Sequence, residues 1–372
     1  MKRVKSLDAI VIGAGIIGLS LAMELNKRGL RVLVVEKGEP GREASWAAGG
    51  MLVDFPGETK SGLQELATAS AGMYPEFVHE LEDESGLKID LRSHGTLVLA
   101  SLGTGQRPVP AEHTKQPSLD LDASALRESE PALQIPNESE RRFTMTSVKE
   151  RCVDPRHLTA AAIAAARHRG IEFSSGDPVL SVEVAGGKAC GVRTSKTQFS
   201  AGMVVNCAGA WAGQIGPHLL PTRPIKGQML CVAMPEKELV RHVVRTVGQT
   251  PDVYLIPRSD GRMLIGATAE EAGFDKQTVP ETIQKLRQAA LDLVPKLADA
   301  RILEAWAGLR PGTPDGLPIL GATPTPGYFV ATGHFRDGIL LAPVTAKVMA
   351  VMMTGQDPQV DMSKFSAARF AS

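Results

Sequence analysis

The sequence is poor in cysteine and in aromatic residues, and it has no excess of charge of either sign. Four of its 372 residues are cysteines. They form neither a C-x-x-C pair nor a cluster with histidine at metal-ligand spacing, so we expect reduced, buried thiols and no metal site. The 41 basic residues equal the 41 acidic residues in number, which removes any electrostatic reason to expect a nucleic acid or an anionic membrane as a partner.

Long apolar runs are also absent. None reaches the roughly 18 residues that a membrane span requires. The N-terminus is basic and then apolar, as in a signal peptide, but glycines interrupt the apolar stretch and a helical pattern follows, which is typical of a buried strand. We therefore expect no membrane span and a cytoplasmic location.

The sequence does contain enough apolar residues, 43%, for large hydrophobic cores, which excludes a disordered chain. Its length exceeds that of one average domain and suggests two. Near the N-terminus, the patterns at 8–12, 15–28 and 31–36 predict a strand, a helix and a strand, which together form a βαβ unit. Further patterns predict helices over 61–85, 155–169, 280–293 and from about 338 to 353, strands within 95–100, 171–205, 225–268 and 328–331, and a loop over 102–118.

A glycine-rich hexapeptide lies where the first predicted strand meets the first predicted helix. Its sequence, Gly13-Ala14-Gly15-Ile16-Ile17-Gly18, is a G-x-G-x-x-G pattern, and Glu36 ends the next strand. In this context the first glycine permits a tight turn, the second lets the backbone approach a pyrophosphate, and the third lets the helix pack on the strand. The positive helix end faces the phosphates, and Glu36 would accept hydrogen bonds from a ribose and repel a ribose phosphate, which argues against NADP. The pattern predicts a dinucleotide site rather than a ligand-free turn, but it does not choose between FAD and NAD.

The remainder of the chain favours FAD through a resemblance. From Ala9, the stretch AIVIGAGIIGLSLAMELNKRGLRVLVVEKG resembles the opening of the FAD-dependent D-amino-acid oxidase superfamily. SWAAGGML at 45–52 resembles that family's loop under the flavin, and CAGAW at 207–211 resembles its second turn close to FAD. Three further segments resemble bacterial glycine oxidases: VYLIPRSDGRMLIGAT (253–268), WAGLRPGTPDGLPILG (306–321) and ATGHFRDGILLAP (331–343). The resemblance covers nearly the whole chain and is weak between about 92 and 147.

The resemblance implies an α/β fold with an FAD-binding Rossmann-like (doubly wound) domain and a mixed-sheet α+β substrate domain. The first would comprise residues 1–90, 148–222 and 306–372, and the second residues 91–147 and 223–305. The family holds FAD noncovalently, oxidises the amine of glycine, sarcosine or a D-amino acid to an imine, and passes the electrons to oxygen, which becomes hydrogen peroxide. Some members serve thiazole synthesis in thiamine production, and the family forms dimers or tetramers.

The matched segments also imply which residues contact FAD. The last predicted helix would begin at Gly338–Ala342, with Pro343 in its first turn, and would direct backbone N–H groups at the flavin, where charge develops on reduction. No cysteine lies near this segment to attach the flavin covalently. The expected FAD contacts are Gly13, Ala14, Gly15, Ile16, Ile17, Gly18, Glu36, Lys37, Ser45, Trp46, Ala47, Ala48, Gly49, Gly50, Met51, Val179, Ala208, Gly209, Trp211, His334, Arg336, Asp337, Gly338, Ile339 and Leu340.

Three residues are expected to bind or orient the substrate. Arg310 lies in an apolar segment with glycine and proline on either side, and its guanidinium can bind a carboxylate through two hydrogen bonds. The alternative for Arg310 is a structural ion pair with a carboxylate of the chain. Tyr254 matches the family's carboxylate-contacting tyrosine, with a surface-directed strand tyrosine as the alternative. Arg336 matches a site arginine over the flavin, with a solvated loop arginine as the alternative.

Met51 and Ala269 complete the expected substrate pocket, and three positions depart from the family. Trp46 stands where the family often has a small polar residue, and Gln249 stands where glycine oxidases can carry a second tyrosine. Ala269 replaces a methionine of glycine oxidases, which predicts a wider pocket and favours a bulkier D-amino acid or a secondary amine over glycine. His334 would be the usual choice of base, but the resemblance implies hydride transfer without an obligatory protein base, so we expect His334 to line the flavin through its backbone.

Other functions remain as alternatives. A dehydrogenase of the same superfamily would pass electrons to a quinone or another carrier instead of oxygen, and it would form no peroxide. An NAD-dependent dehydrogenase would lack the yellow flavin spectrum, since the cofactor supplies that chemistry. A noncatalytic FAD-binding module would not be reduced by any amino acid.

Overall fold

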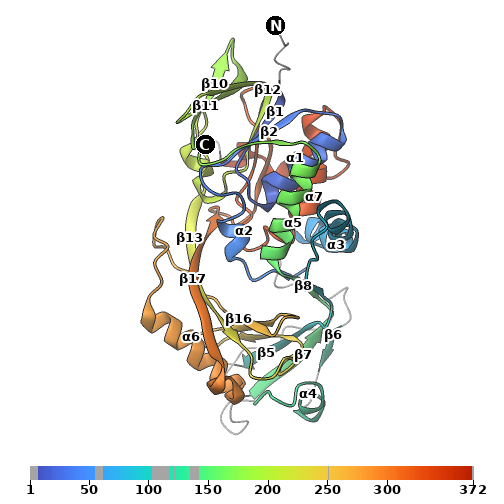
Figure 1. Cartoon of the computed structure of the whole chain (residues 1–372), viewed down its shortest axis with the longest axis vertical. Helices are drawn as coiled ribbons and strands as arrows, with labels where there is room; N and C mark the ends of the chain where they lie inside the picture. Colours follow the sequence, from blue (N-terminus) through green and yellow to red (C-terminus); the bar gives the residue numbers. More distant parts are fainter. Residues whose placement is uncertain are drawn as a thin grey trace.

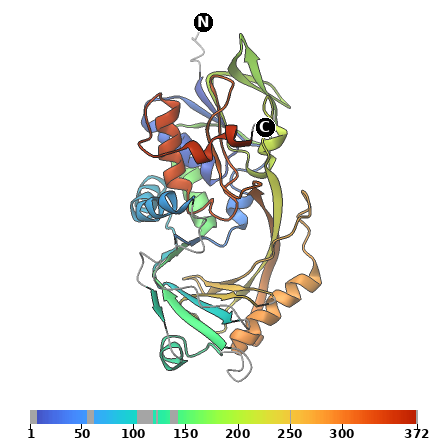
Figure 2. The same ribbon diagram turned by 180° about the vertical axis from the view of Figure 1, so that it is seen from behind.

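The computed structural model of the chain describes residues 7–54, 62–102, 118–120, 123–134, 142–249 and 251–370. They form an elongated molecule with one large sheet in its upper part and another in its lower part (Figure 1). Two long strands, β13 and β17, run between these parts, and Figure 2 shows the same arrangement from behind. The predicted α/β class is confirmed.

The upper sheet contains the βαβ unit that the N-terminal sequence predicts. Strand β1 pairs in parallel with β2 and with β12, so that Ala9 lies opposite both Val32 and Met203. Strand β12 has two different neighbours on its other edge: its first residues pair with β11 and its last residues pair with β19. The strands are β1 (Leu7–Ile12), β2 (Val32–Val35), β9 (Glu172–Ser174), β10 (Val179–Ala185), β11 (Lys188–Thr194), β12 (Gln198–Asn206), β18 (Ile319–Ala322) and β19 (Tyr328–Thr332).

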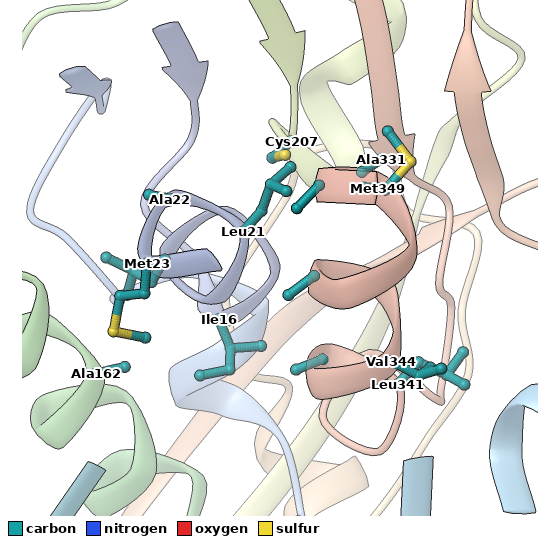
Figure 3. Packing of buried hydrophobic residues seen from close by; sticks show 14 of the residues in the cluster. Ile16, Leu21, Ala22, Met23, Ala162, Cys207, Ala331, Leu341, Val344 and Met349 are labelled. Atoms are coloured by element: carbon teal, nitrogen blue, oxygen red, sulfur yellow. The ribbon is translucent and has the colours of Figure 1, made fainter. Parts of the chain in front are cut away.

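Apolar and small side chains hold the helices of this part against the sheet and against each other. Helix α1 packs on α7, and α3 packs on α5 and α7. Figure 3 shows part of this core, with Leu21 of α1 and Met349 of α7 in one buried cluster. Burying a side chain of this size contributes about 1.5–3 kcal/mol, so the cluster fixes α1 and the glycine-rich turn before it. The helices are α1 (Ile16–Lys27), α3 (Gln64–Ser85), α5 (Pro155–His168) and α7 (Ala342–Met353).

The lower sheet is mixed and has the order β17-β13-β16-β15-β14-β5-β7-β6. Strands β13 and β17 pair antiparallel along their length, from Arg223 opposite Gly312 to Ala233 opposite Arg301. Helix α6 packs on β13 through a core that includes Leu230 and Leu286. The elements are β5 (Thr96–Leu102), β6 (Ser118–Asp120), α4 (Ala123–Ser129), β7 (Arg142–Val148), β13 (Arg223–Ala233), β14 (Val243–Val247), β15 (Tyr254–Pro257), β16 (Arg262–Gly266), α6 (Pro280–Leu293) and β17 (Arg301–Gly312).

Short elements complete the described chain. Three strands form a small sheet of order β3-β8-β4, and helix α2 precedes its first strand. These elements are α2 (Ala44–Ala47), β3 (Met51–Leu52), β4 (Leu91–Arg92), β8 (Arg151–Val153) and the 3₁₀ helices η2 (Gly209–Gln214), η3 (Pro295–Asp299), η4 (Ser363–Phe365) and η5 (Ala367–Phe370).

Some boundaries differ from the predicted ones. The last helix begins at Ala342 and not at Gly338, because residues 338–341 form turns, in which the Ala342 N–H bonds to the Ile339 carbonyl at 3.2 Å. Pro343 does lie in the first helical turn, as expected. Most of the predicted loop over 102–118 lies outside the described residues, and its two ends belong to strands β5 and β6. The assignment of chain segments to two domains stays a prediction.

The prediction of unpaired thiols agrees with the structure, but the prediction that all of them are buried is wrong for one cysteine. All four cysteines are free, and Cys152, Cys207 and Cys231 are buried. Cys190 is exposed, because it lies on the open side of the β10–β11 hairpin, where alternate residues face solvent. Among the described helices, none combines the length and the apolar character needed to cross a membrane.

Candidate functional site

One cavity of about 930 Å³ lies where the glycine-rich turn, the residues around α2 and strands β13, β15 and β17 meet. Its lining residues extend from the N-terminus of α1 in the upper part to strands β13, β15 and β17 of the lower sheet. Most of the residues predicted from the sequence line it: Gly13, Gly15, Ile16, Ile17, Glu36, Lys37, Ser45, Ala47, Ala48, Gly49, Gly50, Met51, Val179, Ala208, Gly209, Trp211, Tyr254, Arg310, His334, Arg336, Asp337, Gly338 and Ile339.

The glycine-rich turn depends on the absence of side chains. Gly13 has a φ of +101°, which side-chain-bearing residues rarely adopt, and a Cβ there would lie 2.6 Å from the Cys207 carbonyl oxygen. A Cβ on Gly18 would lie 2.0 Å from the Gly13 carbonyl oxygen. Residues 13 and 18 therefore let β1, β12 and α1 approach closely, which is the packing role that the sequence predicts for them.

Two side chains reach the backbone N–H groups at this turn. The Glu36 carboxylate accepts hydrogen bonds from the N–H of Ala14 at 2.8 Å and the N–H of Gly38 at 3.0 Å. The Ser45 hydroxyl accepts a hydrogen bond from the N–H of Ile16 at 2.9 Å, so it satisfies one free donor at the start of α1. Glu36 and Ser45 both line the cavity, and their oxygen atoms lie beside the positive helix end that the sequence assigns to a pyrophosphate.

Three residues of the lower sheet and its edge contact the residues around α2: Gly308, Trp306 and Arg258. A Cβ on Gly308 of β17 would lie 2.3 Å from the Ala47 Cβ, which shows how closely strand and helix approach. The Trp306 indole N–H donates to the Ala47 carbonyl at 3.1 Å. Arg258, which is 1% exposed, donates to the Gly49 carbonyl at 2.6 Å. Sequence reasoning missed Arg258, because nothing in the segment VYLIPRSDG marks its arginine as buried.

Arg310 stands in the cavity without a carboxylate partner. Its Nη1 donates to the Thr268 carbonyl oxygen at 2.9 Å. In the described part of the chain no Asp or Glu forms an ion pair with it, so the alternative of a structural ion pair receives no support. Tyr254 lines the same region, with its hydroxyl 3.8 Å from the Met229 sulfur. Arg310 and Tyr254 come from β17 and β15, and strands β13 and β16 lie between them in the sheet.

The C-terminal wall of the cavity contains His334, Arg336 and Asp337. His334 is buried and its Nε2 lies 3.2 Å from the Thr345 hydroxyl. Burial lowers the pKa of His334 to about 3, which keeps the imidazole neutral near pH 7. Burial raises the pKa of Asp337 to about 6, and the neighbouring Arg336 guanidinium opposes that shift. Arg336 itself is exposed.

Several predicted residues lie outside the cavity lining. Ala14, Gly18 and Leu340 are in the core behind it. Ala269 is exposed on the segment that pairs with β13, whereas Ala267, two residues earlier, lines the cavity. The structure therefore does not support a pocket widened by Ala269.

Trp46 also faces away from the main cavity. It lines a neighbouring cavity of about 540 Å³ together with Trp306, and the two indole rings meet edge to face with centroids 5.8 Å apart. The Arg156 guanidinium lies over Trp46, 3.6 Å from its ring centroid. Because α2 turns successive side chains in different directions, Ser45 and Ala47 reach the main cavity while Trp46 does not.

Other lining residues were not singled out from the sequence. Met229 on β13, Arg245 on β14, Asp252 and Ala267 all contribute to the wall around Tyr254. Their positions depend on the pairing of strands far apart in the chain, such as Arg245 opposite Tyr254, which no local sequence pattern provides. Gln249, which the sequence marked as a departure, does not line the cavity.

Comparison with known proteins is consistent with this geometry. The family model described as FAD dependent oxidoreductase (DAO) matches residues 8–352. The chain belongs to this family. FAD is therefore its cofactor, and the chain is an FAD-dependent oxidoreductase. It is similar to a protein named glycine oxidase from Pseudomonas aeruginosa, with 34% identity over 96% of this chain and 98% of the relative.

A second relative and a solved structure extend this result. The chain is 34% identical to a bifunctional protein ThiO/ThiG from Trichormus variabilis, over 98% of this chain but only 55% of that longer protein. The fold is similar to a crystal structure of glycine oxidase from Geobacillus kaustophilus, with a TM-score of 0.88 and 31% identity over 98% of this chain and 99% of the other. The Rossmann-like architecture with a second mixed sheet is thereby confirmed.

The cavity fits FAD. The turn without side chains at Gly13 and Gly15, the helix N-terminus behind it and the buried Glu36 carboxylate form one end. The cavity continues without a break to Arg310. One cavity thus joins the dinucleotide turn to the Arg310 guanidinium.

Proposed function

We propose that the protein oxidises the amine of a small amino acid, such as glycine, sarcosine or a D-amino acid, to an imine, with oxygen as the electron acceptor and hydrogen peroxide as the second product. The glycine oxidases among the relatives support the substrate class. The ThiO/ThiG relative supports a role in making the thiazole of thiamine. The observation that carries the proposal is Arg310, a cavity arginine with no carboxylate partner among the described residues.

In this proposal each part of the cavity has a separate task. Gly13, Gly15 and Glu36 would hold the adenosine diphosphate part of FAD, and the segments 47–51 and 334–339 would lie along the flavin. Bound FAD supplies an acceptor for two electrons and one hydrogen from the substrate carbon.

Arg310 would bind the substrate carboxylate, and this contact fixes the position of the Cα–H bond. Tyr254 would add a second contact to the carboxylate and limit its rotation. In this proposal His334 would not act as a base, because burial lowers its pKa to about 3 and makes it a weak acceptor of protons. The substrate amine must therefore be neutral when it reacts.

Replacing Arg310 tests the proposal. Removing one partner of a desolvated charge pair costs about 2–5 kcal/mol, so Arg310→Ala should lose roughly 30- to several-thousand-fold in kcat/KM for the amino acid. Arg310→Lys should recover little, because a single ammonium does not reproduce the two parallel hydrogen bonds of a guanidinium. An amine without a carboxylate should be affected much less. The measurements are the rate of anaerobic flavin reduction and the Kd of glycolate.

Arg301→Ala is a matched control, since Arg301 is an exposed arginine on the same strand. It should leave both measurements unchanged. If Arg310→Ala binds glycolate as tightly as the parent, Arg310 is a structural residue and the proposal fails in its central part. Peroxide formed per turnover tests the acceptor: a stoichiometry near zero would indicate a quinone or another carrier.

Three further parts complete the proposal, and the first two rest on the resemblance. They are noncovalent FAD, a dimeric or tetrameric assembly and a cytoplasmic location. Acid precipitation should release all flavin into the supernatant, and light scattering should give two or four times the mass of one chain. Flavin retained in the acid pellet would show a covalent link.

A further inference from the structure

The Arg310 guanidinium covers the Cα of Gly227 on the neighbouring strand. Both residues line the cavity, and β13 and β17 pair so that Ile225 lies opposite Arg310 and Gly227 opposite Gly308. A Cβ at position 227 would lie 2.2 Å from Arg310 Nη1 and 2.5 Å from both Cζ and Nη2. These distances are far below van der Waals contact, so Arg310 can occupy this position only if residue 227 has no side chain.

The backbone does not require glycine at position 227. Gly227 lies inside strand β13 and is not among the described glycines with positive φ, so other residues could adopt its conformation. The three atoms nearest to a Cβ at this position all belong to Arg310. The Arg310 guanidinium therefore occupies the space that a side chain at position 227 would fill.

A second restraint acts on the same guanidinium from the side. Arg310 Nη1 donates to the Thr268 carbonyl at 2.9 Å. The Thr268 hydroxyl accepts from the Gln228 N–H at 2.9 Å and donates to the Glu270 carboxylate. The Gln228 amide donates to the same carboxylate at 2.8 Å, and the Glu270 N–H bonds to the Lys226 carbonyl at 2.9 Å.

These bonds attach the segment 268–270 to β13 at positions 226 and 228, immediately before and after Gly227. The Thr268 carbonyl thus holds a fixed place relative to the surface of Gly227. Within the described chain, Nε and Nη2 of Arg310 have no hydrogen-bond partner. One nitrogen is anchored and the other two remain available to a ligand in the cavity.

We infer that Gly227 is a positioning residue for Arg310. Its bare Cα forms the surface on which the guanidinium rests, and the Thr268 carbonyl fixes the guanidinium there, so that the free nitrogens are presented to a substrate carboxylate. Residue 227 then determines the affinity for carboxylates by acting through Arg310. This inference rests on the proposed function of Arg310.

A double-mutant cycle on the FAD-bound protein tests the inference. The proteins are the parent, Gly227→Ala, Arg310→Ala and the double variant, and the probe is glycolate, whose binding is followed by the change in flavin absorbance. Gly227→Ala should weaken glycolate at least about tenfold, which corresponds to about 1.4 kcal/mol. In the Arg310→Ala background the same change should alter the Kd less than about twofold, because coupled residues are not additive.

A second double-mutant cycle uses thermal unfolding of the same four proteins. Its expected pattern of Tm values would not arise from a general packing defect. Gly227→Ala should lower Tm when Arg310 is present and leave it unchanged when Arg310 is replaced by alanine, because the three atoms nearest to a Cβ at position 227 are then gone. Gly202→Ala is the matched control: it also lies in a strand, and a Cβ there meets no atom within 4 Å. It should leave the Kd and Tm unchanged.

The outcomes separate this inference from the proposed function. If Gly227→Ala binds glycolate like the parent, or weakens it equally in both backgrounds, Gly227 does not act through Arg310 and the inference is wrong while the role of Arg310 can stand. If Arg310→Ala itself leaves glycolate binding unchanged, both are wrong. Should Gly227→Ala fail to fold, a folded double variant supports the inference, and a double variant that also fails to fold overturns it.

Discussion

At the scale of single residues, the C-terminal wall of the cavity is less charged than its sequence GHFRDG suggests. Burial lowers the pKa of His334 to about 3 and raises the pKa of Asp337 to about 6. Both shifts favour the neutral form, because a charge in a low-dielectric site loses its hydration. Between about pH 3 and about pH 6, Arg336 is therefore the main charge on this wall.

The shift of Asp337 predicts a pH dependence of stability in the FAD-free protein. An unfolded aspartate has a pKa near 3.8, whereas the folded value is about 6, so between these values the folded state binds more protons than the unfolded state. The unfolding free energy contributed by Asp337 is therefore highest below about pH 4 and falls as the pH rises to about 6, by at most about 3 kcal/mol.

Urea unfolding of the FAD-free protein at pH 4 and pH 7 tests this prediction. Asp337→Asn should remove the penalty, so the variant should gain stability relative to the parent at pH 7 and show little difference at pH 4. Asp299→Asn changes an exposed aspartate and serves as the control. A difference between parent and Asp337→Asn that is the same at both pH values would contradict the shift.

At the scale of elements, the N-terminus of α1 lies close to α2. This closeness predicts that a side chain at position 15 prevents FAD binding. A Cβ on Gly15 would lie 3.2 Å from the Ser45 hydroxyl, which already bonds to the Ile16 N–H. Gly15→Val should fill the space beside the N-terminus of α1 and push Ser45 away. We expect purified Gly15→Val to be largely free of FAD, measured as the ratio of absorbance near 450 nm to that at 280 nm.

The control for this change is Gly202→Val, which places the same side chain on an open strand position. It should keep its flavin. Full FAD occupancy in Gly15→Val would mean that the pyrophosphate does not pass this turn.

The sequence predicts elements well where the pattern is local and less well where an end depends on a tertiary contact. Helix α6 begins at Pro280 and ends at Leu293, as its periodicity predicts. The start of α7 is displaced from Gly338 to Ala342, because the intervening turns pack against the core and no sequence pattern separates them from a first helical turn. The direction of Trp46 could not be predicted either, since it depends on how α2 rests on β17.

At the scale of the whole molecule, the cavity lining includes residues of the N-terminal, middle and C-terminal thirds of the chain. A ligand that binds only the folded state raises its stability, by about 2.7 kcal/mol at a hundredfold excess over Kd. We expect FAD to raise the Tm of the FAD-free protein by several degrees. Flavin release and loss of secondary structure should occur in one transition.

Flavin fluorescence and circular dichroism, recorded during the same heating experiment, check this expectation. Gly15→Val should show no FAD-dependent rise in Tm at the same FAD concentration. Flavin that is released well below the loss of secondary structure would mean that the site opens independently of the two sheets.

The candidate site could be predicted only in part from the residues themselves. The spacing of Gly13, Gly15, Gly18 and Glu36 identifies a dinucleotide turn without any comparison, because its chemistry is local. Arg310 was singled out by its apolar surroundings and by the resemblance. Its closeness to Gly227 could not be foreseen, because it depends on the register between β13 and β17, strands that are far apart in the chain.

The position of β1 in the middle of the upper sheet also has a consequence for how the protein is made. Strand β1 leaves the ribosome long before its neighbour β12, and β19, which continues the sheet beyond β12, is made more than 100 residues later still. Contacts between such distant segments form slowly, because a long loop must close before they are gained. Until β12 has been made, the nascent chain therefore carries an apolar strand with an unpaired edge, and the flavin can be held only after the cavity wall at 334–339 has been made.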